Sequence, residues 1–456
     1  MTYAHDENDR GADLEQFENM EITGISIDSR SIREGELFVA IRGDRFDGHD
    51  FVLNAIKQGA WGAVVERSAL ENRRAALGEI KNLFPVEDTL HALQEMSYMH
   101  RRKFTLPIVG ITGSNGKTTT KEMLANILAR RGPVLKNEGN LNNHIGVPLT
   151  LLKLEAIHKT AAIEMGMSGL GEIDLLARLV GPDVGVITNI GPAHLEFLGS
   201  MDRVAQAKGE LLMNLRADGT AVLNADDAYF KQLAGYFSGR IRTFGFGPNA
   251  DVRASDVRQG GEFTEFTIDA DAVRADIRLH TIGNHNIYNA LAAAAAGFAL
   301  GMSFDEIQRG LDEFRPFAMR SEIRHIHERT VLADCYNANP GSMDAALTAL
   351  VSLKTRGKAV AVLGDMLELG ASAAEAHRKV GRTAAELGLD LLIAVGTNAE
   401  YLIEGAIDAG MRKDRAIPAQ SNSEAAALLR RQTGSGDVVL IKGSRGMKME
   451  KILEEF

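Results

Sequence analysis

The sequence contains a single cysteine, Cys335, among 456 residues. One thiol excludes an internal disulfide and a Cys-rich zinc site, and it suits a reducing compartment, so we expect a cytoplasmic protein. The longest nearly apolar run, 290–302, has 13 residues, fewer than the roughly 20 that span a bilayer. The polar, acidic N-terminus has neither the basic start nor the apolar core of a signal peptide. We therefore predict no membrane insertion.

An excess of positive charge is also missing. Lys and Arg number 51 against 61 Asp and Glu, which gives a net charge of −10. This balance argues against a broad surface for nucleic acid or an anionic membrane. Taken alone it would also discourage an anionic substrate, but bulk charge says nothing about a focused site. We expect small-molecule substrates and a monomeric protein.

The sequence otherwise has the composition of a folded protein, with 45% apolar and 25% charged residues. Its length is about three times the ~150 residues of one domain. Residues 1–86 carry short, mixed α/β elements. Residues 87–316 alternate strands with crossover helices, as in a parallel sheet, and then change to an antiparallel patch at 250–282. Residues 317–456 resume a Rossmann-like alternation. We predict an α/β protein with these three domains.

The strongest local signal is LPIVGITGSNGKTTTKEML at 106–124. An apolar strand leads into glycines, then Lys117 and Thr118, then an amphipathic helix. Such glycines let backbone amides close around phosphate oxygens, the lysine supplies a cation, and the threonine can ligate Mg²⁺. Gly110 precedes Gly116 by one residue more than the general phosphate-loop spacing. We predict a central P-loop nucleotide-binding domain; the loop alone leaves kinase, GTPase, ATPase and ligase open.

The extended loop, with Asn115 inside it, resembles the Mur ligase family of ATP-dependent peptidoglycan ligases. The one-residue departure at Gly110 is expected in that family. Further resemblances follow in order along the chain from about Ile25. They are NEGNLNNHIGVPLTLL (137–152), AAIEMGMSGLGEI (161–173), ITNIGPAHLEFLGS (187–200), AQAKGELL (205–212), GNHNIYNALAAAA (283–295), DCYNANPGSMDAAL (334–347), LGDMLELG (363–370) and IKGSRGMKME (441–450).

The strings at 137–152 and 334–343 look like the family member that adds a dipeptide rather than one amino acid. The resemblance implies ATP, two Mg²⁺ ions, a UDP-N-acetylmuramoyl-tripeptide and D-alanyl-D-alanine. The tripeptide carboxylate would take the γ-phosphate, and the dipeptide amine would attack the acyl phosphate, releasing ADP and phosphate. The alternatives are a sister ligase that adds one amino acid, a folate polyglutamate ligase, and a nucleotide-dependent switch or kinase.

Four residues are the predicted catalytic set: Lys117, Glu164, His194 and Lys208. Glu164 ends an apolar strand run, where α/β sites collect. On sequence alone His194 is an ordinary turn residue and Lys208 a solvated helical lysine. The resemblance makes Thr118, Glu164 and His194 ligands of Mg²⁺ and makes Lys208 a carbamylated lysine. A carbamate faces Mg²⁺ favourably, whereas an ammonium would repel it.

Outside the phosphate loop, the remaining predicted contacts come from the resemblance, and each also has an ordinary interpretation as a turn, helix or surface residue. The residues predicted to bind ATP are Gly113, Ser114, Asn115, Gly116, Lys117, Thr118 and Thr119 in the loop, Asn289 for adenine, Arg320 for the phosphates and Asp334 for ribose. The residues predicted to bind the UDP part are Ser29, Arg30, Asp47 and His49, with Asn140, Asn142 and Asn143 for sugar or diphosphate. The residues predicted to bind the peptide parts are Asn337, Asn339, Lys442, Ser444 and Arg445.

Overall fold

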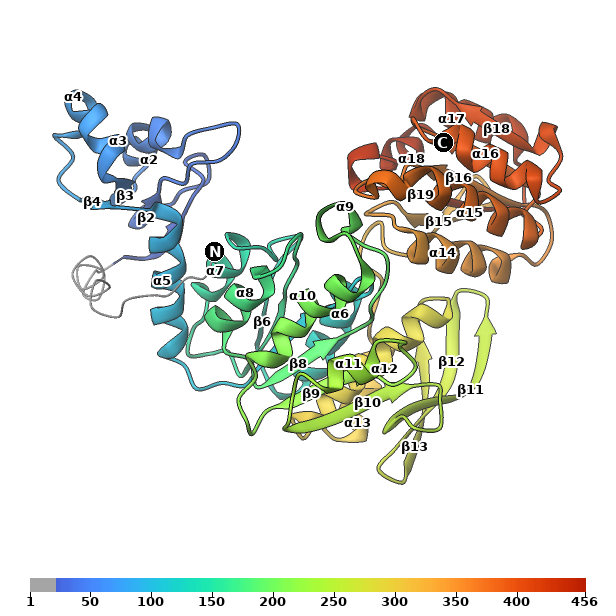
Figure 1. The fold of residues 1–456 in the computed structure, drawn as a ribbon, viewed down its shortest axis with the longest axis horizontal. Coiled ribbons are helices and arrows are strands. Elements are labelled where there is room, and N and C mark those ends of the chain that lie inside the picture. Colours follow the sequence, from blue (N-terminus) through green and yellow to red (C-terminus); the bar gives the residue numbers. More distant parts are fainter. Residues whose placement is uncertain (1–21) are drawn as a thin grey trace. The chain divides into compact units, whose positions relative to one another are not determined.

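The computed structural model describes residues 22–456. The N-terminal stretch, on which the exclusion of a signal peptide rests, lies outside them. The described chain packs into two units. Unit 1 contains residues 22–108, 133–165 and 175–181, and unit 2 contains 109–132, 166–174 and 182–456. The predicted α/β class is confirmed, because three separate sheets alternate with helices along the chain (Figure 1). The three domain boundaries stay predictions.

The first sheet of unit 1 has four parallel strands in the order β1-β2-β3-β4. Its strands are β1 (Gly24–Ser26), β2 (Glu36–Val39), β3 (Gly62–Glu66) and β4 (Leu83–Val86). Its helices are η2 (Gly48–Phe51), α2 (Val52–Lys57), α3 (Arg67–Asn72), α4 (Arg74–Leu77) and α5 (Thr89–Arg102). Alternate residues of β2 face opposite sides: Phe38 belongs to one buried cluster, whereas Leu37 packs in another with Leu93 of α5.

A second pair of strands in unit 1 carries the predicted run AAIE. It pairs β6 (Val134–Lys136) in parallel with β7 (Thr160–Glu164). Helix α7 (Gly146–Leu151) lies between them in sequence and packs against α5. Every β7 residue from 161 onward is buried. Helix α8 (Glu172–Val180) begins in unit 2 and ends in unit 1.

The central sheet strands of unit 2 run in the order β13-β12-β11-β10-β9-β8-β5. Pairing is parallel from β5 to β11 and antiparallel between β11, β12 and β13, so the predicted change of pattern at 250–282 is confirmed. The strands are β5 (Ile108–Thr112), β8 (Val184–Ile187), β9 (Thr220–Asn224), β10 (Arg240–Gly245), β11 (Val252–Gly260), β12 (Phe263–Ala270) and β13 (Val273–Leu279). The helices are α6 (Lys117–Leu128), η3 (Ala129–Arg131), α9 (Leu195–Leu198), α10 (Met201–Met213), α11 (Phe230–Ala234), α12 (Asn284–Ala299) and α13 (Phe304–Asp312).

Helix α12 contains the alanine-rich run that is the longest apolar stretch of the sequence. Residues 290–296 are fully buried, and the helix packs against α6 and against β9 and β10. Small side chains allow this close approach, so the run is explained by burial within a globular core rather than by a membrane. The polar residues at its start, Asn286 and Asn289, are buried as well.

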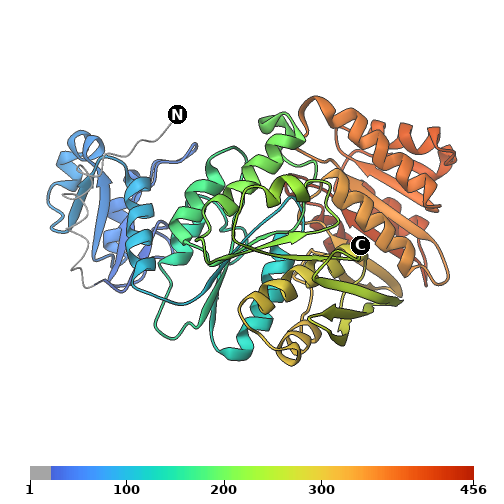
Figure 2. The same ribbon diagram turned by 60° about the horizontal axis from the view of Figure 1, so that its bottom comes forward.

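The C-terminal sheet of unit 2 has the order β14-β15-β19-β16-β17-β18 and is parallel except for β14. Helices α14 to α16 pack on one face, and α17 and α18 pack on the other (Figures 1 and 2). The strands are β14 (Glu322–Ile326), β15 (Arg329–Asp334), β16 (Ala359–Gly364), β17 (Leu391–Val395), β18 (Ala416–Ala419) and β19 (Val438–Lys442). The helices are α14 (Pro340–Leu353), η4 (Gly370–Ser372), α15 (Ala373–Glu386), α16 (Ala399–Asp408), η5 (Lys413–Arg415), α17 (Asn422–Gln432), η6 (Arg445–Met447) and α18 (Glu450–Glu455).

Two strands of this sheet lack the apolar runs that indicated the Rossmann-like alternation. Strand β14 lies at one edge and reads EIRHI, and β18 lies at the other and contains Pro418. An edge strand needs less apolar surface, and it tolerates proline because one side of its backbone is not used in the ladder. Strands of this kind have no strong hydrophobic pattern, and this is why sequence reasoning missed them.

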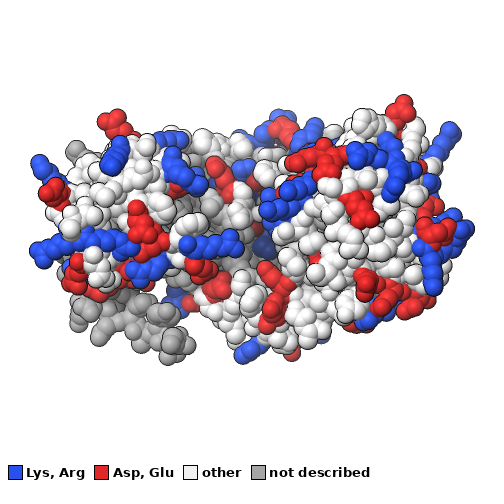
Figure 3. Space-filling view, turned by 90° about the horizontal axis from the view of Figure 1, so that it is seen from above, with Lys and Arg blue, Asp and Glu red and all other residues white. Residues whose placement is uncertain are grey.

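The distribution of surface charge and the character of the helices agree with the composition. On the face shown in Figure 3, basic and acidic side chains are interspersed. Within residues 22–456, no helix has the length and apolar character that crossing a membrane requires. Cys335 is buried as a free thiol.

Candidate active site

The phosphate loop joins β5 to α6 in a conformation that two glycines make possible. Gly113 has φ 148° and Gly116 has φ 82°. A Cβ at Gly113 would lie 1.9 Å from Thr188 Oγ1, and one at Gly116 would lie 2.0 Å from Asn289 Oδ1. Both positions therefore exclude other residues by conformation and by space. Lys117 begins the helix and donates from Nζ to the carbonyl oxygen of Gly113 at 2.8 Å.

The segment that follows β8 supports the loop from behind. Asn189 Oδ1 accepts a hydrogen bond from the backbone N–H of Asn115 at 3.0 Å, and its Nδ2 donates to the carbonyl of Asn115 at 3.0 Å. Ser114 Oγ donates to the carbonyl of Gly191 at 2.9 Å. Sequence reasoning missed Thr188 and Asn189 as supports. The available signal was a polar pair directly after a buried strand, at the sheet edge where α/β sites collect.

Asn289, predicted to read adenine, is buried behind the loop. Its Oδ1 accepts from Thr120 Oγ1 at 3.4 Å, and its Nδ2 donates to Asn286 Oδ1 at 3.2 Å. Protein groups thus occupy both ends of the amide. The structure gives this side chain a supporting part in the loop, and its contact with adenine stays a prediction.

Arg320 lies beside the N-terminal turn of α6. It lines a small pocket together with Thr118, and its guanidinium stacks on the ring of Tyr336 at 3.8 Å. Its buried Nε makes no hydrogen bond within residues 22–456. The flanking Met319 and Ser321 have φ of 63° and 49°. Such strain in non-glycine residues persists mainly at functional sites, so the predicted contact with phosphates is geometrically reasonable.

Lys208 is a buried lysine in the middle of α10, with 2% of its surface exposed. Burial holds the pKa of Lys208 well below its usual value, and the positive charge of Lys117 lowers it further. Both effects favour the neutral amine, which is the form that adds CO₂. The structure thus shows a buried lysine where the sequence alone indicates a solvated one.

His194 precedes α9 in a left-handed conformation, with φ 56°. Its Nδ1 lies 2.9 Å from Glu368 Oε2. Burial lowers the pKa of His194, as do the charges of Lys208 and Lys117, and Glu368 opposes them. A neutral imidazole is the form that binds metal ions.

Glu164 closes β7 in unit 1 and is 3% exposed. Asn137 fixes its backbone, accepting from the Glu164 N–H at 2.9 Å and donating to the Glu164 carbonyl at 2.8 Å. Asn142 Nδ2 donates to Oε1 at 2.8 Å, whereas the buried Oε2 has no hydrogen-bond partner among the described residues. An unsatisfied buried carboxylate oxygen is costly, and a hard cation is a suitable partner for it. Sequence reasoning missed Asn137.

The predicted Mg²⁺ ligands were tested against these observations. No group of three or more His, Cys, Asp or Glu side chains within residues 22–456 gathers into a metal site. The predicted set instead depends on a carbamate at Lys208 and the hydroxyl of Thr118. Within unit 2, the burial of Lys208 and its lowered pKa suit carbamate formation. Within unit 1, the unsatisfied oxygen of Glu164 suits a hard cation. The complete ligand set stays a prediction.

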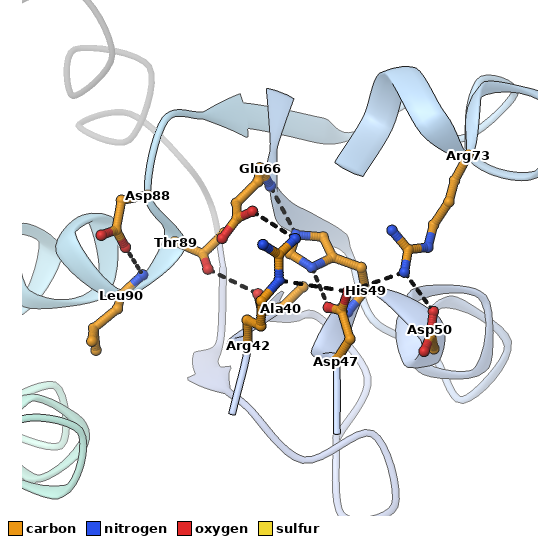
Figure 4. A network of polar contacts seen from close by, with 10 residues as sticks. All are labelled: Ala40, Arg42, Asp47, His49, Asp50, Glu66, Arg73, Asp88, Thr89 and Leu90. Atoms are coloured by element: carbon orange, nitrogen blue, oxygen red, sulfur yellow. Dashed lines mark hydrogen bonds and ion pairs between the residues drawn. The ribbon is translucent and has the colours of Figure 1, made fainter. Parts of the chain in front are cut away.

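In unit 1, the predicted uridine-nucleotide residues Asp47 and His49 form an internal network (Figure 4). His49 is 1% exposed; its Nδ1 lies 2.6 Å from Asp47 Oδ1, and its Nε2 accepts from the backbone N–H of Glu66 at 2.9 Å. Arg73 donates to Asp47 at 3.0 Å and to Asp50 at 2.7 Å. Both ring nitrogens of His49 are thus occupied, so it shapes the loop rather than facing a ligand.

The other predicted residues of unit 1 differ in exposure. Arg30 is exposed and forms a two-point pair with Asp28, which lowers the pKa of Asp28 to about 2. Ser29 is buried and accepts from Asn54. Asn143 Oδ1 accepts from the N–H groups of residues 145 and 146 just before α7, and Asn143 and Asn140 are both exposed. Arg30, Asn140 and Asn143 are therefore the exposed members of this group.

The predicted C-terminal residues join the ends of β15 and β19. Asp334 pairs with Lys442 at 2.5 Å and accepts from the N–H of Ser321 at 3.0 Å. Lys442 Nζ also donates to the carbonyl of Asn337 at 3.0 Å. These bonds bury Lys442 and give it a structural role in joining the two strand ends. Arg445 is the exposed member of the cationic string, paired with Glu450 at 2.8 Å.

Two predicted residues from distant parts of the sequence meet. Asn339 is the N-cap of α14, where its side chain accepts from the N–H of Ser342 at 2.9 Å. Its Nδ2 donates to Asn115 Oδ1, inside the phosphate loop, at 2.7 Å. The start of α14 thus contacts the nucleotide loop directly.

Three family models match successive parts of the chain. They are the Mur ligase family catalytic domain at residues 21–101, the Mur ligase middle domain at 111–297 and the Mur ligase glutamate ligase domain at 319–445. The chain is also similar to the UDP-N-acetylmuramoyl-tripeptide--D-alanyl-D-alanine ligase of Bacillus subtilis (strain 168). The identity is 37% over 444 residues, covering 96% of this chain and 94% of the relative.

Two solved structures are similar over almost the whole chain. MurF from Acinetobacter baumannii is 34% identical with a TM-score of 0.86, and the match covers 94% of this chain and 92% of that one. MurF ligase from Thermotoga maritima in complex with ADP is 29% identical with a TM-score of 0.84, covering 95% and 96%.

Proposed function

This chain belongs to the Mur ligase family, and we propose that it joins D-alanyl-D-alanine to UDP-N-acetylmuramoyl-tripeptide at the expense of ATP. The relative's name and the ADP held by the similar Thermotoga structure support the substrates, as does the string DCYNANPGSM. The observation that carries the proposal is Lys208, a lysine buried inside unit 2 whose pKa is lowered by that burial and by the charge of the phosphate-loop Lys117. A nucleotide switch or a simple kinase has no use for such a group.

In the first step the tripeptide carboxylate takes the γ-phosphoryl group of ATP and becomes an acyl phosphate. The loop amides at 113–116 and the Lys117 ammonium hold the phosphates. Arg320, which lines a pocket with Thr118 of α6, adds positive charge next to the loop. Phosphoryl transfer depends mainly on such positioning and charge neutralisation. In the second step the dipeptide amine attacks the acyl carbon, and phosphate leaves.

Mg²⁺, when bound, would neutralise charge on the transferring phosphoryl group. We assign its ligands to Thr118, Glu164, His194 and Lys208, and expect two ions. Lys208 takes part after its neutral amine attacks CO₂: an N–C bond forms, a proton leaves to solvent, and a carbamate anion results. The unsatisfied Oε2 of Glu164 supports its place in the set.

The exposed candidates are proposed for the larger substrates. Arg30, Asn140 and Asn143 would contact the UDP-sugar, and Arg445 a substrate carboxylate, because these residues are exposed. Asn337 and Asn339 would border the dipeptide from the loop before α14. We further propose a cytoplasmic monomer that meets no nucleic acid; the buried Cys335 suits a reducing compartment.

The decisive experiment measures phosphate release from ATP with UDP-N-acetylmuramoyl-tripeptide present. We expect D-alanyl-D-alanine to stimulate release strongly and single amino acids to have little effect. Equal stimulation by a single amino acid would reassign the chain to a sister ligase. Steady hydrolysis that neither co-substrate alters would contradict the ligase proposal itself.

A further inference from the structure

The loop that follows β16 brings an acidic side chain to the central site. Glu368 lies in this loop, at 365–370, and its Oε2 is 2.9 Å from His194 Nδ1. Helices α9 and η4 adjoin at the same place, since a Cβ on Gly370 would lie 3.5 Å from Cα of Glu196. The contact joins the C-terminal sheet to the segment that carries a candidate cation ligand, all within unit 2.

Buried side chains hold the loop immediately before Glu368. The backbone N–H of Met366 donates to Nε2 of the fully buried His377 at 3.0 Å. The next N–H, of Leu367, donates to the buried Ser444 Oγ at 2.9 Å. Asp365 is fixed in turn, since its carboxylate accepts from the N–H groups of residues 397 and 398. Buried polar networks that are fully satisfied specify one conformation, so the position of Glu368 is built rather than incidental.

Both ends of the contact are conformationally strained. Glu368 has φ 61° and His194 has φ 56°. Left-handed backbone in residues other than glycine is retained where surrounding structure imposes it, often at functional sites. The carboxylate of one such residue lies 2.9 Å from the imidazole of the other. We infer that the fold maintains the strained backbone at both residues in order to keep these two side chains together.

We propose that Glu368 is a positioning residue that orients the His194 imidazole, and that it thereby ties the cation site to the docking of the C-terminal sheet. A histidine that binds a metal usually directs its other ring nitrogen at a carboxylate, which fixes the ring and its tautomer. Glu368 Oε2 is the carboxylate oxygen that faces Nδ1, at 2.9 Å, although the two groups do not have the geometry of a regular hydrogen bond within the described chain. The inference rests on the proposed function, because it takes His194 to be a cation ligand.

The test compares Glu368→Gln with Glu368→Asp and with Glu404→Gln. Glu404 is a matched control: its side chain is 52% exposed against 54% for Glu368, and it pairs with Arg378 at 3.0 Å on the outer helices of the same sheet. Mn²⁺ binding is followed by electron paramagnetic resonance of the free ion, with ADP present. We expect about tenfold weaker binding for Glu368→Gln, partial recovery for Glu368→Asp and no change for the control. In turnover, kcat should fall while KM for ATP holds.

Unchanged Mn²⁺ affinity in Glu368→Gln would overturn the proposal. An equal loss in Glu404→Gln would also overturn it, because the effect would then be a general one of surface charge. The two proposals fail separately. If Mn²⁺ binding depends on Glu368 but the unaltered chain shows no stimulation by D-alanyl-D-alanine, only the assigned substrate is wrong.

Discussion

His49 in unit 1 and Lys208 in unit 2 are buried to nearly the same degree, 1% and 2% exposed, and family resemblance names both as site residues. Both ring nitrogens of His49 are occupied by protein groups. Lys208 is instead buried against the like charge of Lys117, and Glu164 keeps a buried oxygen unsatisfied. Satisfied buried groups hold loops in place, whereas strained or unsatisfied ones are candidates for chemistry.

Replacing Lys208 should have the largest effect. Lys208→Ala removes the amine that would carry the carbamate, and we expect phosphate release to fall on the order of 10³-fold. Bicarbonate or a short carboxylate should restore part of it by filling the vacated space. Full activity of the alanine variant without any additive would contradict the role of Lys208 as the carbamate residue, and with it the contrast between Lys208 and His49.

Glu164→Gln should have the next largest effect, on the order of 10²-fold in kcat. The amide keeps the shape of the side chain but is a much weaker cation ligand, while the Asn137 bonds involve only the backbone. Glu155→Gln, at an exposed glutamate of the same unit, is the control and should behave as the unaltered chain. If Glu164→Gln lost stability but kept its activity, Glu164 would have a structural role, like His49, rather than a role in cation binding.

His49→Ala should show the opposite behaviour. It removes the imidazole from Asp47 and leaves the N–H of Glu66 without its acceptor, so we expect the free energy of unfolding to fall by about 2 kcal/mol, with kcat at saturating substrate within about twofold. The only tryptophan, Trp61, lies in unit 1 and stacks on Phe84, so urea titration by fluorescence reports this unit. His91→Ala, at a more exposed histidine, should change little. Loss of kcat with unchanged stability would contradict a loop-shaping role.

Cys335 should show the smallest effect, because it is buried without any assigned part in the chemistry. Burial raises the pKa of Cys335 to about 12, so iodoacetamide at pH 8 should label it only as fast as the chain unfolds, which mass spectrometry can follow. Above the usual thiol pKa of about 8.5 the unfolded chain ionises first. Stability should therefore decline as pH rises, and Cys335→Ala should remove that part of the decline. Rapid labelling of the folded chain would show that the thiol is accessible.

Much of the fold was predictable because buried strands and amphipathic helices have strong local patterns. The alternation of parallel strands with helices in the central domain and the antiparallel patch at 250–282 were predicted from such patterns. The edge strands β14 and β18 were not, since their short, polar or proline-containing sequences bury little apolar surface.

The site was predictable where chemistry is local and not where it depends on distant pairing. The loop at 113–118 is readable from glycine spacing and the lysine that follows. The supports given by Asn189 and Asn137 and the approach of Glu368 to His194 join segments far apart in sequence. No local pattern carries such contacts, and only the folded structure distinguishes the buried Lys208 from a surface lysine.

The close approach of Gly116 to Asn289 has an evolutionary consequence. Position 116 admits no larger residue, because its φ of 82° would remain unfavourable even if the neighbouring amide were removed. Position 289 is under a weaker steric constraint, since a smaller side chain there opens space, at the cost of the bonds to Thr120 and Asn286. In a library randomised at both positions under selection for growth, variation should accumulate at 289 while 116 stays invariant. The coupling is therefore one-sided, and covariation between the two positions should be weak despite their contact.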